Sequence, residues 1–564
     1  MLLGKLFKSD KLIRHMGKSI RIALLALILI SAFFIRFHKI GYAELLGDEY
    51  IDFSIAVTLK NNPNPFDSNY KYEDFFLDQT RFSHYLTAFL LYWKFNITGS
   101  RILSVIFGTL TVLLVYFIGK ELFNEKAGLI SAALIAFSVY HIAFSRLAMT
   151  SGDSIFLFFY MASMYTFFIG LKYSKNFYIF LSAILTGISI ATKLFGLFLF
   201  PIYLLTLWFY RKKIIFKTKS NRLLKILYFS LAPASIYVLI FILPAYLSNF
   251  KLYLYFISIL LIAIYTTILL YSKTRFMNLF VPIHFLVLAA LYTFTFTPIH
   301  LSLANFLGVF DWFSEWNPSP LASAPYYENF MILFIKLGIV FSIIFIISLA
   351  NFFRKAKSIQ YTYLILFFLV PMLALTAIKW KVTWYLMLIF PIVYLIIGNY
   401  LNDIFHRIKK QKSLYFASLS FFLFFLFLPL YNVQKIYPYY ELQGHKYGDS
   451  SIGYNKAAFL SFEGIRAASN YIEQNTEEDA TVVIYLFDLE YTFYDYSFTN
   501  FMYYQKKNPG RYILVESKEE LANGNYDYVL LNFYSKKSAV ISKTCILNKT
   551  FTIDTIEAFY LYKC

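Results

Sequence analysis

Apolar runs of about 20 residues recur from residue 20 to residue 431, and this recurrence constrains the fold more than any other feature. A helix of that length crosses the hydrocarbon core of a bilayer. Hydrophobic residues make up 59% of the 564 residues, and charged residues only 15%. Because lipid forces backbone polar groups to pair within each segment, the sequence predicts a polytopic α-helical membrane protein. A transmembrane barrel would instead show short alternating segments.

The sequence predicts about thirteen transmembrane helices, an odd number, with the N-terminus in the cytoplasm. The first run lacks a small-residue cleavage site, so we expect a retained anchor helix. Segment 85–98 is too short to span, and we expect it to lie on the outer surface as an interfacial helix. The expected spans are 20–37, 100–119, 127–144, 154–171, 176–192, 194–210, 226–247, 252–271, 278–296, 329–350, 359–378, 382–400 and 413–431.

The charges are divided between the two sides of this topology. Every basic cluster between spans falls in a loop expected inside, which is the positive-inside pattern. The net charge of +20 therefore indicates orientation in a plasma or inner membrane and gives no sign of nucleic-acid binding. The acidic residues of the membrane part lie mostly outside, and because they contribute little to topology, their placement needs another explanation.

The C-terminal part differs in composition and predicts a second domain. We divide the chain into a transmembrane domain, 1–433, with an outer loop, 38–99, and a small extracytoplasmic α/β domain, 434–564. Cys545 and Cys564 are too few for a Cys-rich zinc site, and they would pair only if this end faces an oxidising compartment. The expected helix is 462–474, and the expected strands are 480–487, 511–515, 526–531 and 558–562.

Carboxylates gather in the outer loop, with Asp48-Glu49 at its centre. A cluster of acidic side chains beside a bilayer calls for a chemical role, although Glu44 and Asp52 also fit solvated loop charges or helix caps. The acidic residues of the loop are Glu44, Asp48, Glu49, Asp52, Asp67, Glu73, Asp74 and Asp78.

Several short motifs follow one another over residues 20–400. They are Asp48-Glu49, Arg81-Phe-Ser-His84, Ser100-Arg101 through Gly108, Ser138 through Arg146 before Asp153, Thr192-Lys193, and Lys379-Trp380-Lys381 before Trp384-Tyr385. This ordered set resembles the membrane glycosyltransferases that use polyprenyl-phosphate sugars, namely the protein O-mannosyltransferase and lipid A aminoarabinose transferase group. The prolines that many members carry in a His-Pro-Pro motif are absent after His84.

The resemblance implies a C-type glycosyltransferase fold, an undecaprenyl- or dolichyl-phosphate monosaccharide as donor, and a lipid, glycan or protein hydroxyl as acceptor. In such a reaction a carboxylate can deprotonate the attacking hydroxyl, and we assign Asp48 as that base with Glu49 beside it. The leaving phosphate needs cations. The donor-phosphate candidates are Arg81, Lys193, Lys379 and Lys381, and the supporting residues are His84, Arg146, Asp153 and Tyr385.

Most of these residues also fit a structural role. Lys193 could snorkel at a helix end, and Lys379 and Lys381 could anchor the interface. Arg146 and Asp153 could form an ion pair that closes an outer loop. Lys336, within a span, would either snorkel or line a cavity. We expect no required cofactor, and a divalent metal remains open; its candidate ligands are His300, Asp311 and Glu315.

Two other functions remain as alternatives. A transporter or flippase for a lipid-linked sugar would place ionisable residues near mid-membrane and show paired broken helices, whereas these span centres are nearly uncharged. An oligosaccharyltransferase-like enzyme would use a diphosphate donor and a metal. That group carries a Trp-Trp-Asp motif, which Asp311-Trp312 does not match.

Overall fold

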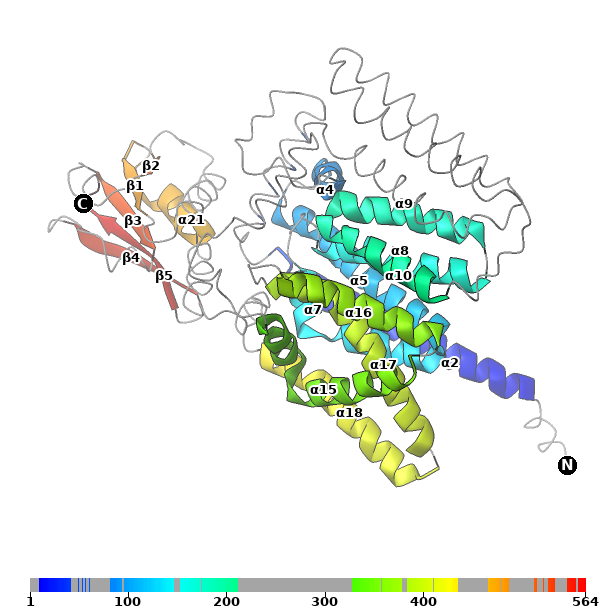
Figure 1. Ribbon diagram of the computed structural model, residues 1–564. Helices are drawn as coiled ribbons and strands as arrows, with labels where there is room; N and C mark the ends of the chain where they lie inside the picture. The colour runs from blue at the N-terminus through cyan, green and yellow to red at the C-terminus, as the bar shows by residue number, and fades with distance from the viewer. Residues whose placement is uncertain are drawn as a thin grey trace, which may run out of the picture.

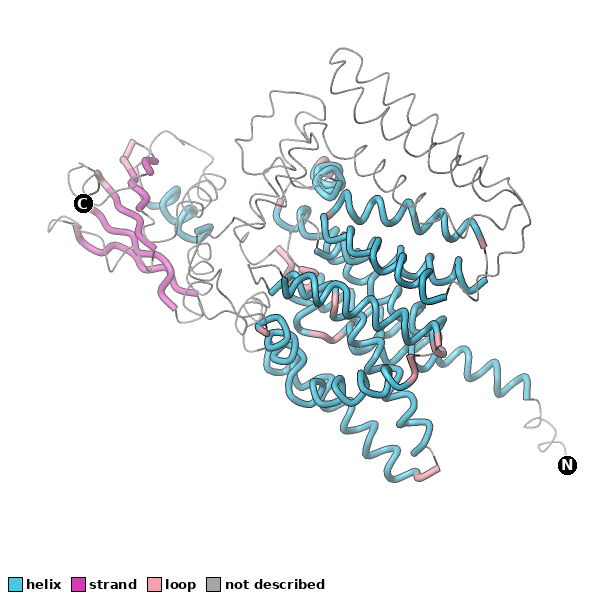
Figure 2. The backbone as a smooth tube through the Cα atoms, viewed as in Figure 1, coloured by secondary structure: helices cyan, strands magenta, loops and turns pink. Residues whose placement is uncertain are grey.

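The structure is a computed structural model, and it shows a helical domain and a small sheet (Figure 1). Figure 2 separates the two by colour, with all the strands near the C-terminus. The described residues are 10–41, 49, 53, 56, 60, 82–93, 96–146, 153–173, 175–210, 327–356, 358–377, 383–408, 410–434, 465–477, 479–485, 512–514, 521, 526–532, 545–553 and 556–564.

Helices dominate the part of the chain up to Gln434, and one large apolar core joins them. Helix α5 packs against α2, α6 and α8, and α17 packs against α6. The helices are α2 (Asp10–Phe37), α4 (Phe82–Leu91), α5 (Ile97–Leu122), α6 (Glu125–Ala136), α7 (Val139–Phe144), α8 (Asp153–Tyr173), α9 (Asn176–Thr192), η1 (Leu194–Phe198), α10 (Leu199–Tyr210), α15 (Glu328–Arg354), α16 (Ile359–Ala377), η4 (Thr383–Leu388), α17 (Phe390–Ile408) and α18 (Lys412–Gln434).

Six helices within the described ranges are long and apolar enough to cross a membrane, so the chain is an integral membrane protein. The expected spans 226–247, 252–271 and 278–296 lie outside the described residues. The six candidate spans are Ser19–Phe37, Ile97–Leu122, Ser154–Tyr173, Glu328–Arg354, Ile359–Thr376 and Tyr385–Ile408.

Three expected spans are interrupted or begin irregularly. The span 127–144 is two helices, because Ser138 ends the run of α6 and caps α7 by accepting a hydrogen bond from the His141 amide at 3.3 Å. The spans 194–210 and 382–400 begin with the 3₁₀ turns η1 and η4. An uninterrupted apolar run cannot reveal such breaks, since its hydrophobicity is the same on both sides of them.

The expected interfacial segment 85–98 is also wrong in its limits. Helix α4 ends at Leu91, and α5 begins at Ile97 because the Asn96 side chain accepts from the Gly99 amide at 2.9 Å. One face of α4 is buried, while Phe89, Tyr92 and Trp93 are exposed. Exposed aromatic residues on a short apolar helix fit a position at the membrane interface.

A polar cluster inside the helical domain holds α8, α9 and α10 together. The hydroxyl of Ser163 is 2.7 Å from the hydroxyls of Thr186 and Tyr203 and 3.1 Å from that of Ser182. Hydrogen bonds between buried side chains of neighbouring helices are a common means of association in lipid. The cluster fixes the two helices on either side of η1.

Helix α15 has a kink at Gly338, whose φ of +75° is one that glycine adopts readily. The Ser342 hydroxyl donates to the Phe334 carbonyl at 3.0 Å across this kink. Lys336 lies in the same stretch, half-buried. The kink therefore interrupts the regular hydrogen bonding of a candidate span without leaving this carbonyl unpaired.

The sheet has five strands in the order β2-β1-β3-β5-β4. Strand β1 pairs parallel with β2 and β3, whereas β5 pairs antiparallel with β3 and β4. Cys545 and Cys564 form a disulfide that joins the open end of the β4–β5 hairpin. The elements are α21 (Ile465–Asn475), β1 (Val482–Tyr485), β2 (Tyr512–Leu514), β3 (Tyr528–Asn532), β4 (Ile546–Ile553) and β5 (Ile556–Lys563).

Candidate functional site

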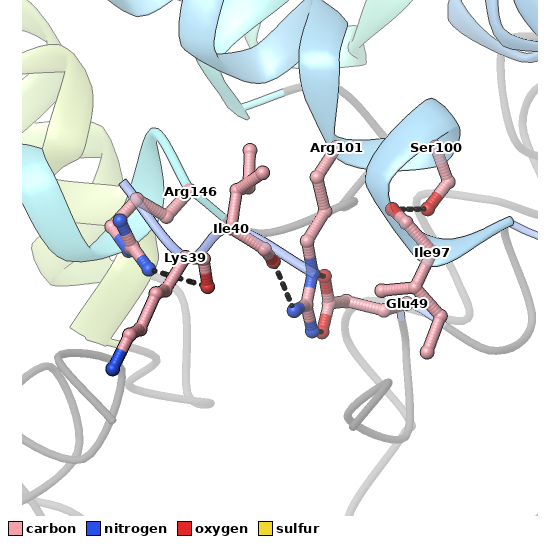
Figure 3. A network of polar contacts seen from close by, with 7 residues as sticks. All are labelled: Lys39, Ile40, Glu49, Ile97, Ser100, Arg101 and Arg146. Atoms are coloured by element: carbon pink, nitrogen blue, oxygen red, sulfur yellow. Dashed lines mark hydrogen bonds and ion pairs between the residues drawn. The ribbon is translucent and has the colours of Figure 1, made fainter. Parts of the chain in front are cut away.

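The carboxylate of Glu49 lies in a buried ion pair with Arg101 of α5 (Figure 3). Arg101 donates from Nε to Oε1 at 2.9 Å and from Nη2 to Oε2 at 2.8 Å, and both side chains are 0% exposed. Its Nη1 donates to the carbonyl of Ile40 at 2.9 Å. A planar guanidinium that binds both carboxylate oxygens fixes the direction of the carboxylate as well as its position. One arginine therefore connects the start of the outer loop with its acidic centre.

Arg146 holds the end of α2. Its Nη1 donates to the carbonyls of Ile35, Arg36 and His38 at 3.1, 2.8 and 2.9 Å. Its Nη2 donates to the carbonyl of Lys39 at 3.4 Å, as Figure 3 also shows. The last carbonyls of a helix lack intrahelical partners and favour a nearby cation. Arg146 therefore fixes the point where the chain leaves the first span.

Lys39 adopts a strained backbone conformation at this point. Its φ of 50° lies in the left-handed region, which is uncommon for residues other than glycine. Two residues further on, a Cβ on Gly41 would lie 2.2 Å from Oγ1 of Thr98. The first residues of the loop are thus pressed against the beginning of α5, and the arginine contacts on both sides hold them there.

Arg36 is the third buried arginine at this end of the helices. Its Nε donates to Ser145 Oγ at 2.8 Å, and its Nη1 donates to the carbonyls of Ala32 and Ala136 at 2.9 and 3.1 Å. Its Nη2 contacts Nδ1 of His141 at 2.7 Å and the carbonyl of Ile135 at 3.4 Å. Arg36, Arg101 and Arg146, which we call the arginine network, together fix the chain around residues 35–41 and Glu49.

Lys193 and Tyr385, both predicted from the sequence as site residues, lie together. Lys193 follows α9, and its ammonium is 5.4 Å from the ring centroid of Tyr385 in η4 and 5.6 Å from that of Phe195 in η1. The two rings meet edge to face, with centroids 4.6 Å apart. This cation–π arrangement holds a positive charge at the junction of two 3₁₀ turns.

His84 lies on the buried face of α4, with a side chain that is 0% exposed. Asp153 begins α8. Four predicted residues lie outside the described residues, as do the acidic neighbours Glu44 and Asp52 and the metal candidates His300, Asp311 and Glu315. The four are Asp48, Arg81, Lys379 and Lys381. Among the described residues, no group of three or more His, Cys, Asp or Glu side chains could hold a metal ion.

Sequence reasoning missed Arg36, Arg101 and His141 as parts of the site. Arg101 stood inside a motif, and Arg36 stood at the end of the first apolar run, where an arginine normally reaches the interface. Both arginines carried a weak signal in the sequence, because an ionisable side chain inside or against a span is a candidate for a functional position. His141 gave no such signal, since a lone histidine in an apolar run is usually structural.

Comparison with known proteins supports the resemblance to the membrane glycosyltransferases that use polyprenyl-phosphate sugars. The family described as dolichyl-phosphate-mannose-protein mannosyltransferase matches residues 80–237. No curated protein matches the chain.

Two solved structures of one protein share the fold at low identity, and a third solved structure, of another protein, also matches this chain. ArnT from Cupriavidus metallidurans bound to undecaprenyl phosphate has a TM-score of 0.55 and 10% identity, over 96% of this chain and 97% of that chain. The apo state of the same protein has a TM-score of 0.52 and 10% identity, over 97% and 98%. The archaeal oligosaccharyltransferase AglB from Archaeoglobus fulgidus has a TM-score of 0.49 and 14% identity, over 92% and 70%.

Proposed function

We propose that this protein is an inverting glycosyltransferase that moves a monosaccharide from a polyprenyl phosphate to a hydroxyl acceptor at the outer face of the membrane. The donor lipid is of the undecaprenyl or dolichyl class, and the acceptor is a lipid, a glycan or a protein. The observation that carries the proposal is the buried ion pair between Glu49 and Arg101, which fixes the residue next to Asp48 at the outer end of the helices.

The ion pair separates the roles of the two neighbouring acids. Both oxygens of Glu49 accept hydrogen bonds from Arg101, so this carboxylate serves as an anchor in the described structure. Asp48 is the adjacent residue, and we assign it as the general base. It takes the proton of the acceptor hydroxyl, the hydroxyl oxygen bonds to the anomeric carbon, and the bond from that carbon to the phosphate oxygen breaks. The single displacement inverts the anomeric carbon.

The leaving polyprenyl phosphate is an anion, and cations stabilise it as the bond breaks. Lys193 is our best supported candidate, because its ammonium is already held against Tyr385 and Phe195. We assign Arg81, Lys379 and Lys381 to the same role from the sequence. An ammonium provides a point charge, and an arginine adds a planar pair of donors that fits phosphate oxygens.

The distribution of polar groups supports an outward-facing site and a cytoplasmic N-terminus. Ion pairs join the helix ends expected inside, as between Arg21 and Glu125 or between Lys172 and Glu121. The disulfide between Cys545 and Cys564 supports an oxidising environment for the C-terminal domain. We therefore place both the outer loop and the sheet on the extracytoplasmic side.

The test is sugar transfer by the Asp48→Asn variant. Membranes containing the wild type are incubated with radiolabelled undecaprenyl- and dolichyl-phosphate monosaccharides, and label is followed into lipid, glycan and protein fractions. We expect Asp48→Asn to insert and purify as the wild type does while losing transfer by about 10²-fold or more, the range of general-base catalysis. Asp67→Asn, an acidic substitution in the same loop, is the control. Full transfer by Asp48→Asn would reject Asp48 as the base.

The same assay separates the alternatives. A flippase would expose the labelled lipid on the other side of the vesicle without forming a new glycosidic bond. An oligosaccharyltransferase-like enzyme would consume only diphosphate-linked donors and would lose activity with a metal chelator. Transfer from a monophosphate donor that survives chelation supports the proposed reaction against both.

A further inference from the structure

Arg36 is a buried cation whose hydrogen bonds all go to neutral groups. Its side chain is 0% exposed, and its hydrogen-bond partners are a serine hydroxyl, a histidine nitrogen and three backbone carbonyls. Within the described part of the chain, no carboxylate contacts it. A buried charge without a counter-ion is costly. A chain keeps such a group where its geometry is needed, since neutral side chains would fill the same space at lower cost.

The contacts of Arg36 join four separate segments. They connect α2 with the end of α6 at Ile135 and Ala136, with His141 of α7, and with Ser145 after α7. Ile135 and Ala136 are the last two residues of α6, where the break before α7 ends the regular helical pairing. Arg36 therefore satisfies acceptors that an unbroken helix would have paired internally.

His141 acts as an acceptor in this group. A guanidinium only donates, so the contact of Arg36 Nη2 with Nδ1 requires that nitrogen to be unprotonated. His141 is thereby held as the neutral tautomer with its proton on Nε2. Two donated bonds from Arg36, to His141 within α7 and to Ser145 at its C-terminal cap, fix α7 relative to α2.

The contacts between α2 and the turn after α7 are reciprocal. Arg36 donates to Ser145, and Arg146, the next residue along, donates to the carbonyl of Arg36 at 2.8 Å. Helix α5 closes against the same place, because a Cβ on Gly108 would lie 2.4 Å from Cβ of Ser145. The position at which the chain leaves α2 is thus determined by three helices at once.

From these contacts we propose that Arg36 is a positioning residue for glycosyl transfer. It fixes the exit of the chain from α2, and hence the segment His38–Gly41 that Arg101 connects with Glu49, so that the acidic pair is held in register with the donor site. The expected effect on kcat rests on the proposed function. The expected effect on the position of the loop rests on the structure alone.

The kinetic test compares Arg36→Gln with Arg21→Gln, the same substitution near the other end of the candidate span Ser19–Phe37. We expect Arg36→Gln to lower kcat by about 10²-fold, the effect of a misplacement of roughly 1 Å, with the donor KM nearly unchanged. Arg36→Lys keeps the charge but cannot make all five bonds, so we expect it to restore little of kcat. Arg21→Gln should transfer sugar as the wild type does.

A smaller change covers the case in which Arg36→Gln fails to fold. Ser145→Ala removes one acceptor and leaves the arginine, and we expect it to lower kcat by about 10-fold. Full recovery of kcat in Arg36→Lys, or a rise in donor KM with kcat unchanged, would show that the charge acts on the phosphate, and it would overturn the positioning role. Wild-type kcat in folded Arg36→Gln or in Ser145→Ala would overturn it as well.

A second measurement does not depend on activity. Lys39 is exposed, and trypsin cleaves after it only when the surrounding segment opens. We expect Arg36→Gln and Ser145→Ala to speed cleavage at Lys39 in the purified protein by about 10-fold or more, with Arg21→Gln unchanged. If the wild type transfers no sugar but both variants are cleaved faster, the proposed function is rejected and the positioning of the loop is kept. An unchanged cleavage rate would overturn the positioning itself.

Discussion

The charged residues at the two ends of the helical domain differ in their burial and in the groups that they contact. At the end that we propose faces outward, Glu49 and Arg101 are fully buried. All three arginines of the network bind backbone carbonyls, and Arg36 and Arg101 also bind side chains. At the opposite end, which we propose faces the cytoplasm, the pair between Arg21 and Glu125 joins side chains that are 34% and 25% exposed, at 3.1 Å. Exposed pairs of this kind contribute about 0.2–1 kcal/mol, whereas breaking a buried pair costs about 3–5 kcal/mol.

This difference indicates what each end is for. The inner charges are consistent with orienting the protein in the membrane and need no fixed geometry. The charges at the proposed outer end are buried, and they hold a few residues of one loop in a single arrangement. A chain gains little stability from a buried ion pair compared with apolar packing, so its retention at the outer end points to a requirement for position.

The largest expected effect comes from comparing glutamate-to-glutamine substitutions in the two ion pairs, one at each end of the helical domain. Glu49→Gln removes the carboxylate charge that accepts two hydrogen bonds from buried Arg101, and we expect a loss of about 3–5 kcal/mol in the free energy of unfolding, together with loss of transfer. Glu125→Gln should cost less than about 1 kcal/mol and keep full transfer. Denaturant unfolding in detergent and the transfer assay measure the two quantities.

Replacing both partners refines this comparison. The double variant Glu49→Leu/Arg101→Leu removes both charges, and we expect it to recover much of the stability lost in Glu49→Gln while remaining inactive. Activity in the double variant would show that the ion pair is only structural. Equal losses of stability in Glu49→Gln and Glu125→Gln would remove the contrast between the two ends.

A smaller effect is expected for two glycines of α5. A Cβ at Gly108 would lie 2.4 Å from Cβ of Ser145, and a Cβ at Gly119 would lie 2.8 Å from Cα of Gly128. Overpacking costs about 1–3 kcal/mol, so both alanine variants should lower thermal stability. Only Gly108→Ala should also lower kcat, because only that site adjoins the arginine network. A similar fall of kcat in Gly119→Ala would mean that activity follows stability alone.

The smallest effect on stability is expected at the donor site. Lys193→Met removes a cation held against Tyr385 and Phe195, an interaction of about 0.5–2 kcal/mol. We expect a modest loss of stability but a clear rise in the KM for the polyprenyl-phosphate donor. Lys175→Met, at the other end of α9, is the control, and it should leave the KM unchanged. An unchanged KM in Lys193→Met would remove this lysine from the phosphate site.

The sequence predicted the class of fold well because hydrophobic length is a local property. It placed Asp48-Glu49 at the centre of the outer loop and named Lys193 and Tyr385, which lie together in the structure. It did not show that Glu49 is tied to Arg101, because 52 residues separate them along the chain. Nor could it show Arg36 turning inward, since a cation at the end of an apolar run has the same sequence signature when it points to water.

The irregular elements were missed for a related reason. The break between α6 and α7 lies inside a continuous apolar run, and its one local signal was Ser138, which caps α7. Strand β4 was missed because polar residues interrupt it and its outer positions are exposed, while its place in the sheet depends on pairing with β5 and on the disulfide. Contacts distant in sequence decide such elements, and periodicity does not record them.

Mass spectrometry of the lipid that copurifies with the Asp48→Asn variant tests the central claim most directly. A protein that positions a polyprenyl-phosphate sugar but lacks its base should retain the intact donor. We predict a polyprenyl-phosphate monosaccharide bound to Asp48→Asn, and free polyprenyl phosphate bound to the wild type. A diphosphate-linked glycan, or no polyprenyl lipid in either protein, would contradict the account.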